Sequence, residues 1–561
     1  MTTSRFFNQA FWVRALPFAA VYGVYAAGLP LDVMDVDSAQ YAEISREMLE
    51  SGSFLQIYER GSDYLDKPPL VFWLTALSYA LFGVSEVAFR LPSVLFSILG
   101  NYATYGLAKR YYGTQVGYWA ALIIASCQAF FLFNHDVRTD TMLTGSVIFA
   151  IWQINEFLHT GRNRHVWLGF TGIAAAMLAK GPIGLLVPVL AFATDFILKR
   201  QWGHFLRWQW LAGVAWVAVL LLPMCIGLYQ QFDLHPEKVM YGRTGTSGIR
   251  FYFWTQSFGR ITGESTWNNR NDLTFFMHTF LWAFLPWCLI FVVALVLKIK
   301  ELVVLRFRQP VTGEALTVGG FVLPFIAFTS SRYHLPHYIF VLFPLAAVLA
   351  AGYLNRVLEA GNRSARTWRW VQLFVGAVVW TVAVLLTMVV FPLRQQLVWG
   401  VLAGLVGLAI WFSVRSSRVG QIIWFPLVSV VAANVVMNLH FYPALFRFQS
   451  GSVAGRYLLG QEVRTYYCYR DHPHSLDFAA RRFAVDIADP QAFVREAVVA
   501  PRWVYTDETG LNELRAAGGK VTKMKEMPDF NVSMLSLMFL NPNTRASEVE
   551  KRFLVKVVRG G

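Results

Sequence analysis

The sequence is poor in charged residues. Asp, Glu, Lys and Arg make up 15% of its 561 residues, whereas soluble domains carry about 25%. Hydrophobic residues account for 56% of the chain, far more than a protein surrounded by water on all sides can bury. This composition excludes an ordinary soluble protein and indicates a membrane protein.

Cysteine is scarce and the common nucleotide-binding motifs are missing. The four cysteines lie mostly inside apolar runs and have no paired spacing, which excludes both a disulfide framework and a cysteine metal site. The chain has no Walker motif, dinucleotide fingerprint, internal repeat or low-complexity segment. The function must therefore be sought in the polar residues between the apolar runs.

Apolar runs recur along the chain up to about residue 441. Crossing a bilayer takes about 20 residues of helix, because backbone polar groups cannot stay unpaired in lipid. The runs predict about thirteen transmembrane helices, centred near residues 20, 100, 125, 149, 173, 190, 219, 286, 321, 345, 380, 405 and 431. The predicted fold class is a membrane all-α protein with a small α/β domain after it.

Lys and Arg fall in every second connection, as in the pair Lys109 and Arg110 and the pair Arg415 and Arg418. This alternation predicts that these connections and the N-terminus are cytoplasmic. An odd number of spans then places the C-terminal tail on the outer side. The net charge of +15 is explained by this topology and by anionic lipid, so no nucleic-acid partner is expected.

The chain divides into a polytopic part, residues 1–445, and a tail, residues 446–561, of ordinary soluble composition. In the tail, "RTYYCYR", "RRFAVDI" and "RWVYTD" are predicted strands, whereas "DPQAFVREAVVA" and "DETGLNELRAAGG" are predicted helices. Strands that alternate with helices favour a small α/β domain.

The first outer loop, residues 31–88, predicts two further helices. "SAQYAEISREMLESG" has an apolar stripe and ends at Gly52, and "KPPLVFWLTALSYALFG" begins at Pro68 and Pro69 but is short for a span. Both are predicted to lie in the membrane–water interface. Helices in this position can hold a polar site at headgroup depth.

Ionisable and polar residues gather at the outer ends of the predicted spans. Asp37 follows the first span; taken alone, it is most simply a helix cap. The others come from several loops: Asp66, Lys67, Arg138, Asp140, Lys180, Arg260, Arg332, His334 and Tyr338. Charge at a membrane boundary is costly and usually functional. Singly, Lys180 could anchor its helix, Arg332 could snorkel, and His334 could be a polar interface residue.

Together these residues suit a reaction on a lipid-linked phosphate. Cations stabilise a phosphate as it leaves, and a carboxylate can accept the proton of an attacking group. A transporter of lipid-linked sugars would need charges at the midplane and often has repeated halves, and neither is present here. A further alternative is a binding subunit without catalytic activity. The joint presence of Asp37, Lys67 and Asp140 argues against it.

Six motifs occur in a distinctive order: "DSAQYAEISREML", "YLDKPPLVFWL", "FRLPS", "LAKGPIGL", "FLPW" and "LPHYIFVLFPLAAVLA". They resemble those of the polyprenyl-phosphate-dependent GT-C glycosyltransferases of the protein-mannosyltransferase-like superfamily, and most of all the bacterial lipid A aminoarabinose transferase group. The resemblance implies a protein of the bacterial inner membrane with thirteen spans and with interfacial helices in the first outer loop. It also implies a C-terminal α/β domain in the periplasm.

The resemblance also implies roles for particular residues. Asp37 matches the catalytic acid, with Tyr41 and Glu43 in the same motif, and Asp140 matches a second acid. Lys67 matches the residue that binds the donor phosphate. Further donor-phosphate ligands follow from the same matches and from position: Arg260, Tyr338, Tyr41, Lys180 and Arg332.

Four positions depart from the aminoarabinose transferase pattern: Ser38, Gln40, Asp66 and Thr255 replace Glu, Arg, Glu and His. The last two resemble metal ligands of that group. Asp66 remains the candidate ligand for a divalent ion. Zinc is not predicted, because Thr255 replaces the histidine. The catalytic framework is kept, whereas the residues that recognise donor and acceptor are changed.

The predicted function is transfer of a sugar from a polyprenyl-phosphate donor to a lipid A-like, glycan or protein acceptor on the periplasmic face. The first alternative is a flippase for lipid-linked sugar that performs no chemistry. The second is a protein O-glycosyltransferase of the same fold. The expected partners are the lipid-linked donor, the acceptor and membrane lipids.

Overall fold

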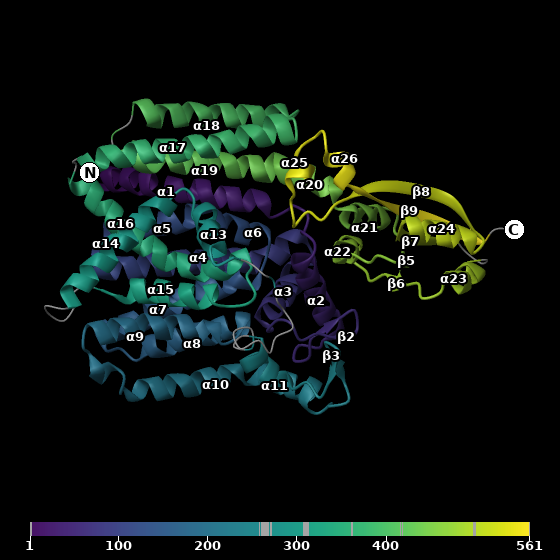
Figure 1. Cartoon of the computed structure of the whole chain (residues 1–561), viewed down its shortest axis with the longest axis horizontal. Helices are drawn as coiled ribbons and strands as arrows, with labels where there is room; N and C mark the ends of the chain where they lie inside the picture. Colours follow the sequence, from purple (N-terminus) through teal and green to yellow (C-terminus); the bar gives the residue numbers. More distant parts are fainter. Residues whose placement is uncertain are drawn as a thin grey trace.

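A computed structural model gives the fold of the chain (Figure 1). It describes residues 3–256, 259, 269, 272–306, 314–360, 363–415, 417, 419–497 and 501–559. A large helical part contains the N-terminus, and a smaller part with a sheet projects from one end and carries the C-terminus at its tip (Figure 1).

The helical part consists of long helices that run roughly side by side, with α2 and α3 near the end that faces the sheet (Figure 1). The helices before the long outer loop that follows residue 228 are α1 (Thr3–Gly28), α2 (Asp37–Ser51), α3 (Leu70–Phe82), α4 (Glu86–Tyr112), α5 (Thr114–Ser126), α6 (Gln128–His135), α7 (Thr139–Thr160), α8 (Arg164–Lys180), α9 (Ile183–Leu198) and α10 (Trp208–Leu228). The later ones are α11 (Gly248–Arg250), α13 (Phe275–Ala283), α14 (Cys288–Arg306), α15 (Leu316–Thr329), α16 (Phe343–Ala360), α17 (Arg363–Leu385), α18 (Gln396–Val414), α19 (Phe425–Val436) and α20 (Tyr442–Leu445). Two short hairpins, β1 (Tyr58–Glu59) with β2 (Ser62–Asp63) and β3 (Val239–Met240) with β4 (Arg243–Thr244), lie in the loops.

Within the described residues, five helical stretches are long and apolar enough to cross a membrane: Trp202–Asp233, Pro336–Ala360, Ser364–Val390, Gln396–Val414 and Gly420–Phe448. Two bent pairs, α5 with α6 and α13 with α14, raise this number to seven if each pair is one span. Three shorter apolar helices are α3, α9 and α15. The protein is therefore a multi-pass membrane protein.

The predicted span centres fall in helices, with one exception. Residue 286 lies in the break between α13 and α14, where the two helices turn by 120°. The apolar run there is continuous in sequence, but the chain changes direction at Pro286, which cannot donate a helical hydrogen bond. The count of thirteen membrane crossings stays a prediction.

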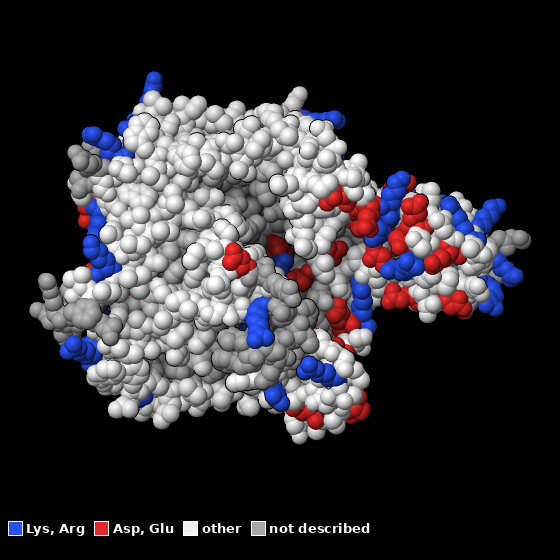
Figure 2. Space-filling model, viewed as in Figure 1, with Lys and Arg blue, Asp and Glu red and all other residues white. Residues whose placement is uncertain are grey.

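Charge is distributed unevenly over the surface. The side of the helical part seen in Figure 2 is almost without Asp, Glu, Lys and Arg, whereas Lys and Arg gather at the end opposite to the sheet. The projecting part carries both signs of charge in close mixture (Figure 2). A charge-free belt between charged ends is the pattern that a bilayer imposes.

The two helices predicted in the first outer loop are confirmed. α2 ends where Gly52 adopts the left-handed conformation (φ 71°) and donates its N–H to the Met48 carbonyl. α3 begins directly after Pro69. The interfacial position of both helices stays a prediction; within the protein, α2 packs on α3 and on helix α22 (His474–Ala480).

The polar face of α2 is stabilised by an internal ion pair. Buried Arg46 donates to Glu43 at 2.6 Å and to Glu50 at 2.8 Å, and its guanidinium lies 4.2 Å from the centre of the Phe483 ring. Burial raises the pKa of Glu43 to about 7, although hydrogen bonds from Arg46 oppose the shift. Glu43 and Arg46 are thus buried against the projecting part instead of facing solvent.

The projecting part contains a five-stranded mixed sheet in the order β6-β5-β7-β9-β8. Its strands are β5 (Tyr466–Tyr469), β6 (Val485–Asp486), β7 (Arg502–Asp507), β8 (Gly519–Asp529) and β9 (Glu550–Arg559). β5 is parallel to β6 and β7, whereas β9 is antiparallel to β7 and β8. One apolar cluster joins the sheet to α21 (Ser450–Gly460) and α22, and another joins it to α23 (Pro490–Glu496) and α24 (Glu508–Ala516).

The three predicted strands of the tail are β5, β6 and β7, and the two predicted helices are α23 and α24. The prediction missed β8 and β9. In β8 the polar residues outnumber the apolar ones, and most of its side chains are exposed. Such an edge strand is stabilised by pairing with β9, which sequence periodicity does not report.

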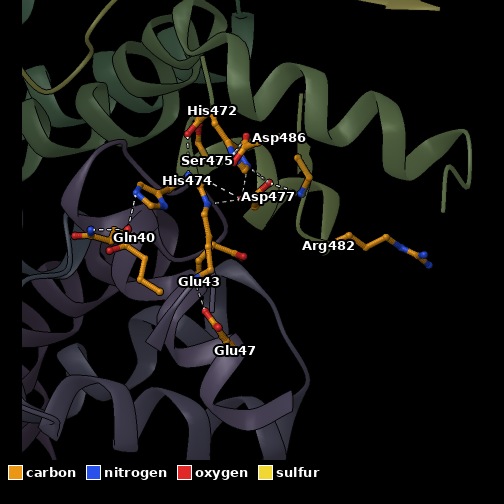
Figure 3. A network of polar contacts seen from close by, with 12 residues as sticks. Gln40, Glu43, Glu47, His472, His474, Ser475, Asp477, Arg482 and Asp486 are labelled. Carbon is orange, nitrogen blue, oxygen red and sulfur yellow. Dashed lines mark hydrogen bonds and ion pairs between the residues drawn. The ribbon is translucent and has the colours of Figure 1, made fainter. Parts of the chain in front are cut away.

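A buried carboxylate joins the tail to the first outer loop (Figure 3). Asp477 on α22 accepts hydrogen bonds from Arg60 Nε at 2.9 Å, from the Tyr466 hydroxyl at 2.8 Å and from His472 Nε2 at 2.9 Å. Burial alone would raise the pKa of Asp477, but its hydrogen bond with His472 and the charges of His472 and Arg60 lower it overall. The ionised carboxylate is therefore the stable form in the folded protein.

We expect Asp477→Asn to loosen the tail, because it leaves Arg60 without its anionic partner. The cost should be about 3 kcal/mol, the range for removing one member of a buried ion pair. Because the pKa of Asp477 is lowered on folding, its contribution is fully present above the ordinary value of about 3.9 and disappears as the pH falls below it. Thermal unfolding and the rate of trypsin cleavage in the tail should both show the loss at pH values of about 5 and above.

Asp486→Asn is the matched control. Asp486 contacts the same histidine at 2.8 Å, but its side chain is 72% exposed, so its loss should cost less than about 1 kcal/mol. Equal effects of the two substitutions would show that Asp477 does not hold the tail in place.

Candidate active site

Asp37 is the first residue of α2 and lies where the first outer loop meets the start of α7. Val36 before it makes no side-chain capping bond, and the Asp37 carboxylate accepts a hydrogen bond from Arg138. The simple helix-cap role is therefore excluded. The side chain of Asp37 is 43% exposed, so one side of the carboxylate stays open.

Arg138 orients this carboxylate. Its guanidinium also donates to Asp136 at 2.8 Å and is largely buried. Burial lowers the pKa of Arg138, but the nearby charges of Asp136 and Asp37 raise it above its ordinary value overall. A permanent cation therefore fixes Asp37 from one side.

A second carboxylate, Asp140 in the first turn of α7, is buried. It accepts a hydrogen bond from Lys180 Nζ at 2.5 Å, and His337 Nε2 lies 3.7 Å from its other oxygen. Lys180 also lies 4.1 Å from the centre of the Tyr338 ring. The end of α8 and the segment before α16 thus meet at Asp140.

Asp37 lines two cavities. The larger has a volume of about 540 Å³ and is lined mainly by the first outer loop and by the loop that contains β3 and β4. The smaller, of about 140 Å³, extends between α7, α8, α9 and α15 and is mostly apolar. Six residues line both: Asp37, Tyr41, Lys67, Gln256, Leu335 and Tyr338.

The structure brings together most of the predicted site residues. Asp37, Tyr41, Lys67 and Tyr338 line both cavities, Asp66 lines the larger, and Asp140 and Lys180 line the smaller. Arg332 is exposed and lines neither. Arg260 lies outside the described residues.

Asp66 is not part of a metal site within the described residues. Its carboxylate accepts a hydrogen bond from the Tyr241 hydroxyl, and its carbonyl accepts one from Gln256. The described part of the chain contains no group of three or more His, Cys, Asp or Glu residues that could hold a metal ion. Among the described residues, Asp66 therefore has no set of partner ligands for a divalent ion, its role as a metal ligand stays a prediction, and no chemistry is assigned to a metal.

Sequence reasoning missed several residues of the larger cavity. They come from the stretch "YGRTGTSGIR" and include Tyr241, Arg243, Ser247 and Arg250. Arginines among glycines and hydroxyl residues in a long outer loop are a recognisable signal for anion binding. His337 was also missed, because nothing near it in sequence indicates that it faces Asp140.

The segment that leads into Asp37 is held by the tail. The Asp35 carboxylate accepts hydrogen bonds from the Ser475 amide at 3.0 Å and from the Ser475 hydroxyl, and the Asp35 amide donates to Gln449 at 3.0 Å. Burial raises the pKa of Asp35 to about 6, although its bonds with Ser475 and the charge of His474 oppose the shift.

The cavity wall is connected to the tail as well. Gln40 donates to Glu59 at 2.8 Å, and Glu59 lies 3.1 Å from His474 of α22 (Figure 3). Gln40 therefore joins the larger cavity to the tail, at the position where the sequence departs from the aminoarabinose transferase pattern.

Comparison with solved structures defines the class of fold. The structure superposes on a crystal structure of ArnT from Cupriavidus metallidurans bound to undecaprenyl phosphate, with a TM-score of 0.71 and 20% identity, over 97% of this chain and 98% of that one. The apo form of the same protein matches equally well, with a TM-score of 0.71. The chain thus has the GT-C membrane fold.

Comparison of sequences is consistent with this class. Residues 66–226 match the family described as dolichyl-phosphate-mannose-protein mannosyltransferase. Two relatives are named undecaprenyl phosphate-alpha-4-amino-4-deoxy-L-arabinose arabinosyl transferase. The one from Edwardsiella ictaluri is 26% identical over 61% of this chain and 59% of its own length. The one from Pseudomonas aeruginosa is 30% identical over 58% of this chain and 56% of its own length. The matched part of the chain therefore spans less than two thirds of the length of these relatives. The resemblance that the motifs indicate is confirmed.

Lys180→Met should destabilise the protein by about 3 kcal/mol, because buried Asp140 then loses its ion-pair partner. The double variant Asp140→Asn/Lys180→Met should recover much of this loss, since neither charge remains. A double-mutant cycle of unfolding temperatures in detergent measures the coupling. Additive losses would show that the two side chains do not interact as described.

Proposed function

We propose that this protein is an integral-membrane glycosyltransferase that transfers a sugar, hexosyl or pentosyl, from a polyprenyl-phosphate donor to an acceptor at the outer membrane surface. The acceptor is a lipid A-like molecule, a glycan or a protein. One observation carries the proposal: the open carboxylate of Asp37 and the cation of Lys67 line both cavities. Two substrates that enter from different sides would therefore meet at these groups.

The smaller cavity suits the lipid-linked donor. Its apolar walls between membrane helices can hold a polyprenyl chain, and Lys67, Lys180 and Tyr338 lie where the chain would end in its phosphate. Cations and hydroxyl donors stabilise the negative charge that grows on a departing phosphate. Arg260, and with less structural support Arg332, are further proposed phosphate ligands.

The larger cavity suits the acceptor. An acceptor oxygen attacks the anomeric carbon as the bond to the polyprenyl phosphate breaks, and the polyprenyl phosphate leaves as an anion. Asp37 orients the attacking group and, where that group is a hydroxyl, takes its proton. Attack from the face opposite to the leaving phosphate inverts the anomeric configuration.

The proposed arrangement in the cell follows from the charge pattern and the relatives. The protein lies in the bacterial inner membrane, with the N-terminus in the cytoplasm and the tail in the periplasm. Residues 1–445 form the catalytic membrane domain, and residues 446–561 form a domain that holds the segment leading into Asp37. Two hydrogen bonds support this division of roles: the Ser475 amide donates to the Asp35 carboxylate, and the Asp35 amide donates to the Gln449 side chain.

Asp37→Asn should lower the transfer rate by about 10³-fold, the typical contribution of a positioned acid or base. The assay follows radiolabelled sugar from a panel of polyprenyl-phosphate donors to lipid A and to total lipid, glycan and protein extracts. Glu50→Gln, a change on the opposite side of the same helix, is the matched control and should keep the parent rate. If the parent and Asp37→Asn both bind the donor but neither transfers its sugar, the protein would instead be a flippase or a binding subunit.

Lys67→Met should weaken donor binding by about tenfold, the loss expected for one charge-assisted hydrogen bond. The affinity for sugar-free polyprenyl phosphate is measured by its competition with labelled donor. This measurement separates weaker phosphate binding from a lower rate of sugar transfer. Asp37→Asn should bind the same ligand as tightly as the parent does. Unchanged affinity in Lys67→Met would remove Lys67 from the phosphate site.

A further inference from the structure

One segment of the tail differs from the rest of the projecting part. Residues 530–547 contain no Asp or Glu, although the surrounding surface is densely charged (Figure 2). Four large apolar side chains within it are exposed: Met534 by 73%, Leu535 by 41%, Leu537 by 86% and Met538 by 50%. We call residues 531–540, which include helix α25 (Leu537–Leu540), the apolar loop.

The apolar loop is firmly packed on its inner side. Phe539 is fully buried, and its ring stacks on Phe530 at 3.8 Å and meets Phe448 edge-on at 5.1 Å between ring centres. Ser536 accepts a hydrogen bond from the Phe539 amide. The outer side chains are thus held away from the protein by a fixed backbone, and exposed apolar groups held in this way usually mark a contact surface.

The apolar loop lies beside the ends of two candidate membrane spans. The Phe530 amide donates to the carbonyl of Phe448, at 2.8 Å, and Arg545 donates to the carbonyl of Val390, at 2.7 Å. Phe448 and Val390 are the last residues of two stretches apolar enough to span a membrane. Figure 1 shows α25 at the ends of α17, α18 and α19.

The adjoining surface of the helical part is also apolar. Met388 and Val389 before the turn, and Leu397 at the start of α18, are exposed. Arg545 lies with its guanidinium 4.4 Å from the centre of the Phe391 ring, between this surface and the apolar loop. The loop therefore continues the lipid-facing surface of α17 and α18 onto the tail.

We propose that the apolar loop inserts Met534, Leu535, Leu537 and Met538 into the membrane leaflet on the side of the tail. The occupant of this surface is lipid, because the loop is continuous with helices that face lipid and carries no acidic residue that a phospholipid headgroup would repel. The proposal rests on the position of the loop at the end of the spans and not on the catalytic function.

The test uses the full-length protein in lipid nanodiscs. Cys225→Ala removes the one cysteine that is partly exposed, since the other three are buried. A polarity-sensitive fluorophore is then attached to Leu537→Cys, to Leu397→Cys on α18 as the lipid-exposed reference, or to Thr509→Cys on α24 as the water-exposed reference. Phospholipid with a nitroxide near the top of the acyl chain serves as the quencher.

We expect blue-shifted emission at position 537 and quenching at least about threefold stronger than at position 509, as at position 397, because a shallow insertion reaches the upper acyl chain. In a second variant, Leu537→Glu combined with a label at Met534→Cys, the added charge should lift the loop and remove most of the quenching. Emission and quenching at position 537 equal to those at position 509 would overturn the proposal and leave a surface for a protein partner.

Discussion

Lipid does not solvate charge, and this constraint determines where chemistry can occur in the protein. The helices that cross the membrane leave an almost uncharged belt, and the acids and bases are confined to its ends. At one end, Asp37, Lys67, Asp140 and Lys180 come from four separate segments and meet around two cavities. The Asp37 carboxylate is paired with Arg138, and the Asp140 carboxylate is paired with Lys180. An isolated charge at this depth would be too costly.

The tail is part of the same construction. α2 begins at Asp37, and the tail contacts both the chain before it, at Asp35, and the chain beside it, through Gln40 and Glu59. Asp477 holds Arg60 of the loop that follows α2. The tail thus contacts the helix that begins at Asp37, and a change in its docking would be transmitted to Asp37 through backbone rather than through side chains alone.

Much of the fold could be predicted because it depends on local pattern. Long apolar runs report helices directly, and Gly52 and Pro69 mark the limits of α2 and α3 as turn chemistry requires. Partnerships between distant residues could not be predicted in this way. Asp35 and Ser475 are 440 residues apart and Asp37 and Arg138 are 101 apart, and no periodicity in either segment identifies the other.

The same limit explains what was missed. The polar stripe of α2 has the pattern of a helix at an interface, but Glu43 and Arg46 neutralise each other inside the protein, and the partner that buries them, α22, is encoded more than 400 residues later. The two cavities share a wall made of Asp37, Lys67 and Tyr338. A molecule in one cavity would therefore contact side chains that also line the other. For the proposed transferase, this geometry favours a sequential order, in which both substrates are bound before any bond breaks. The polyprenyl phosphate left after transfer would then inhibit the enzyme until it diffuses away.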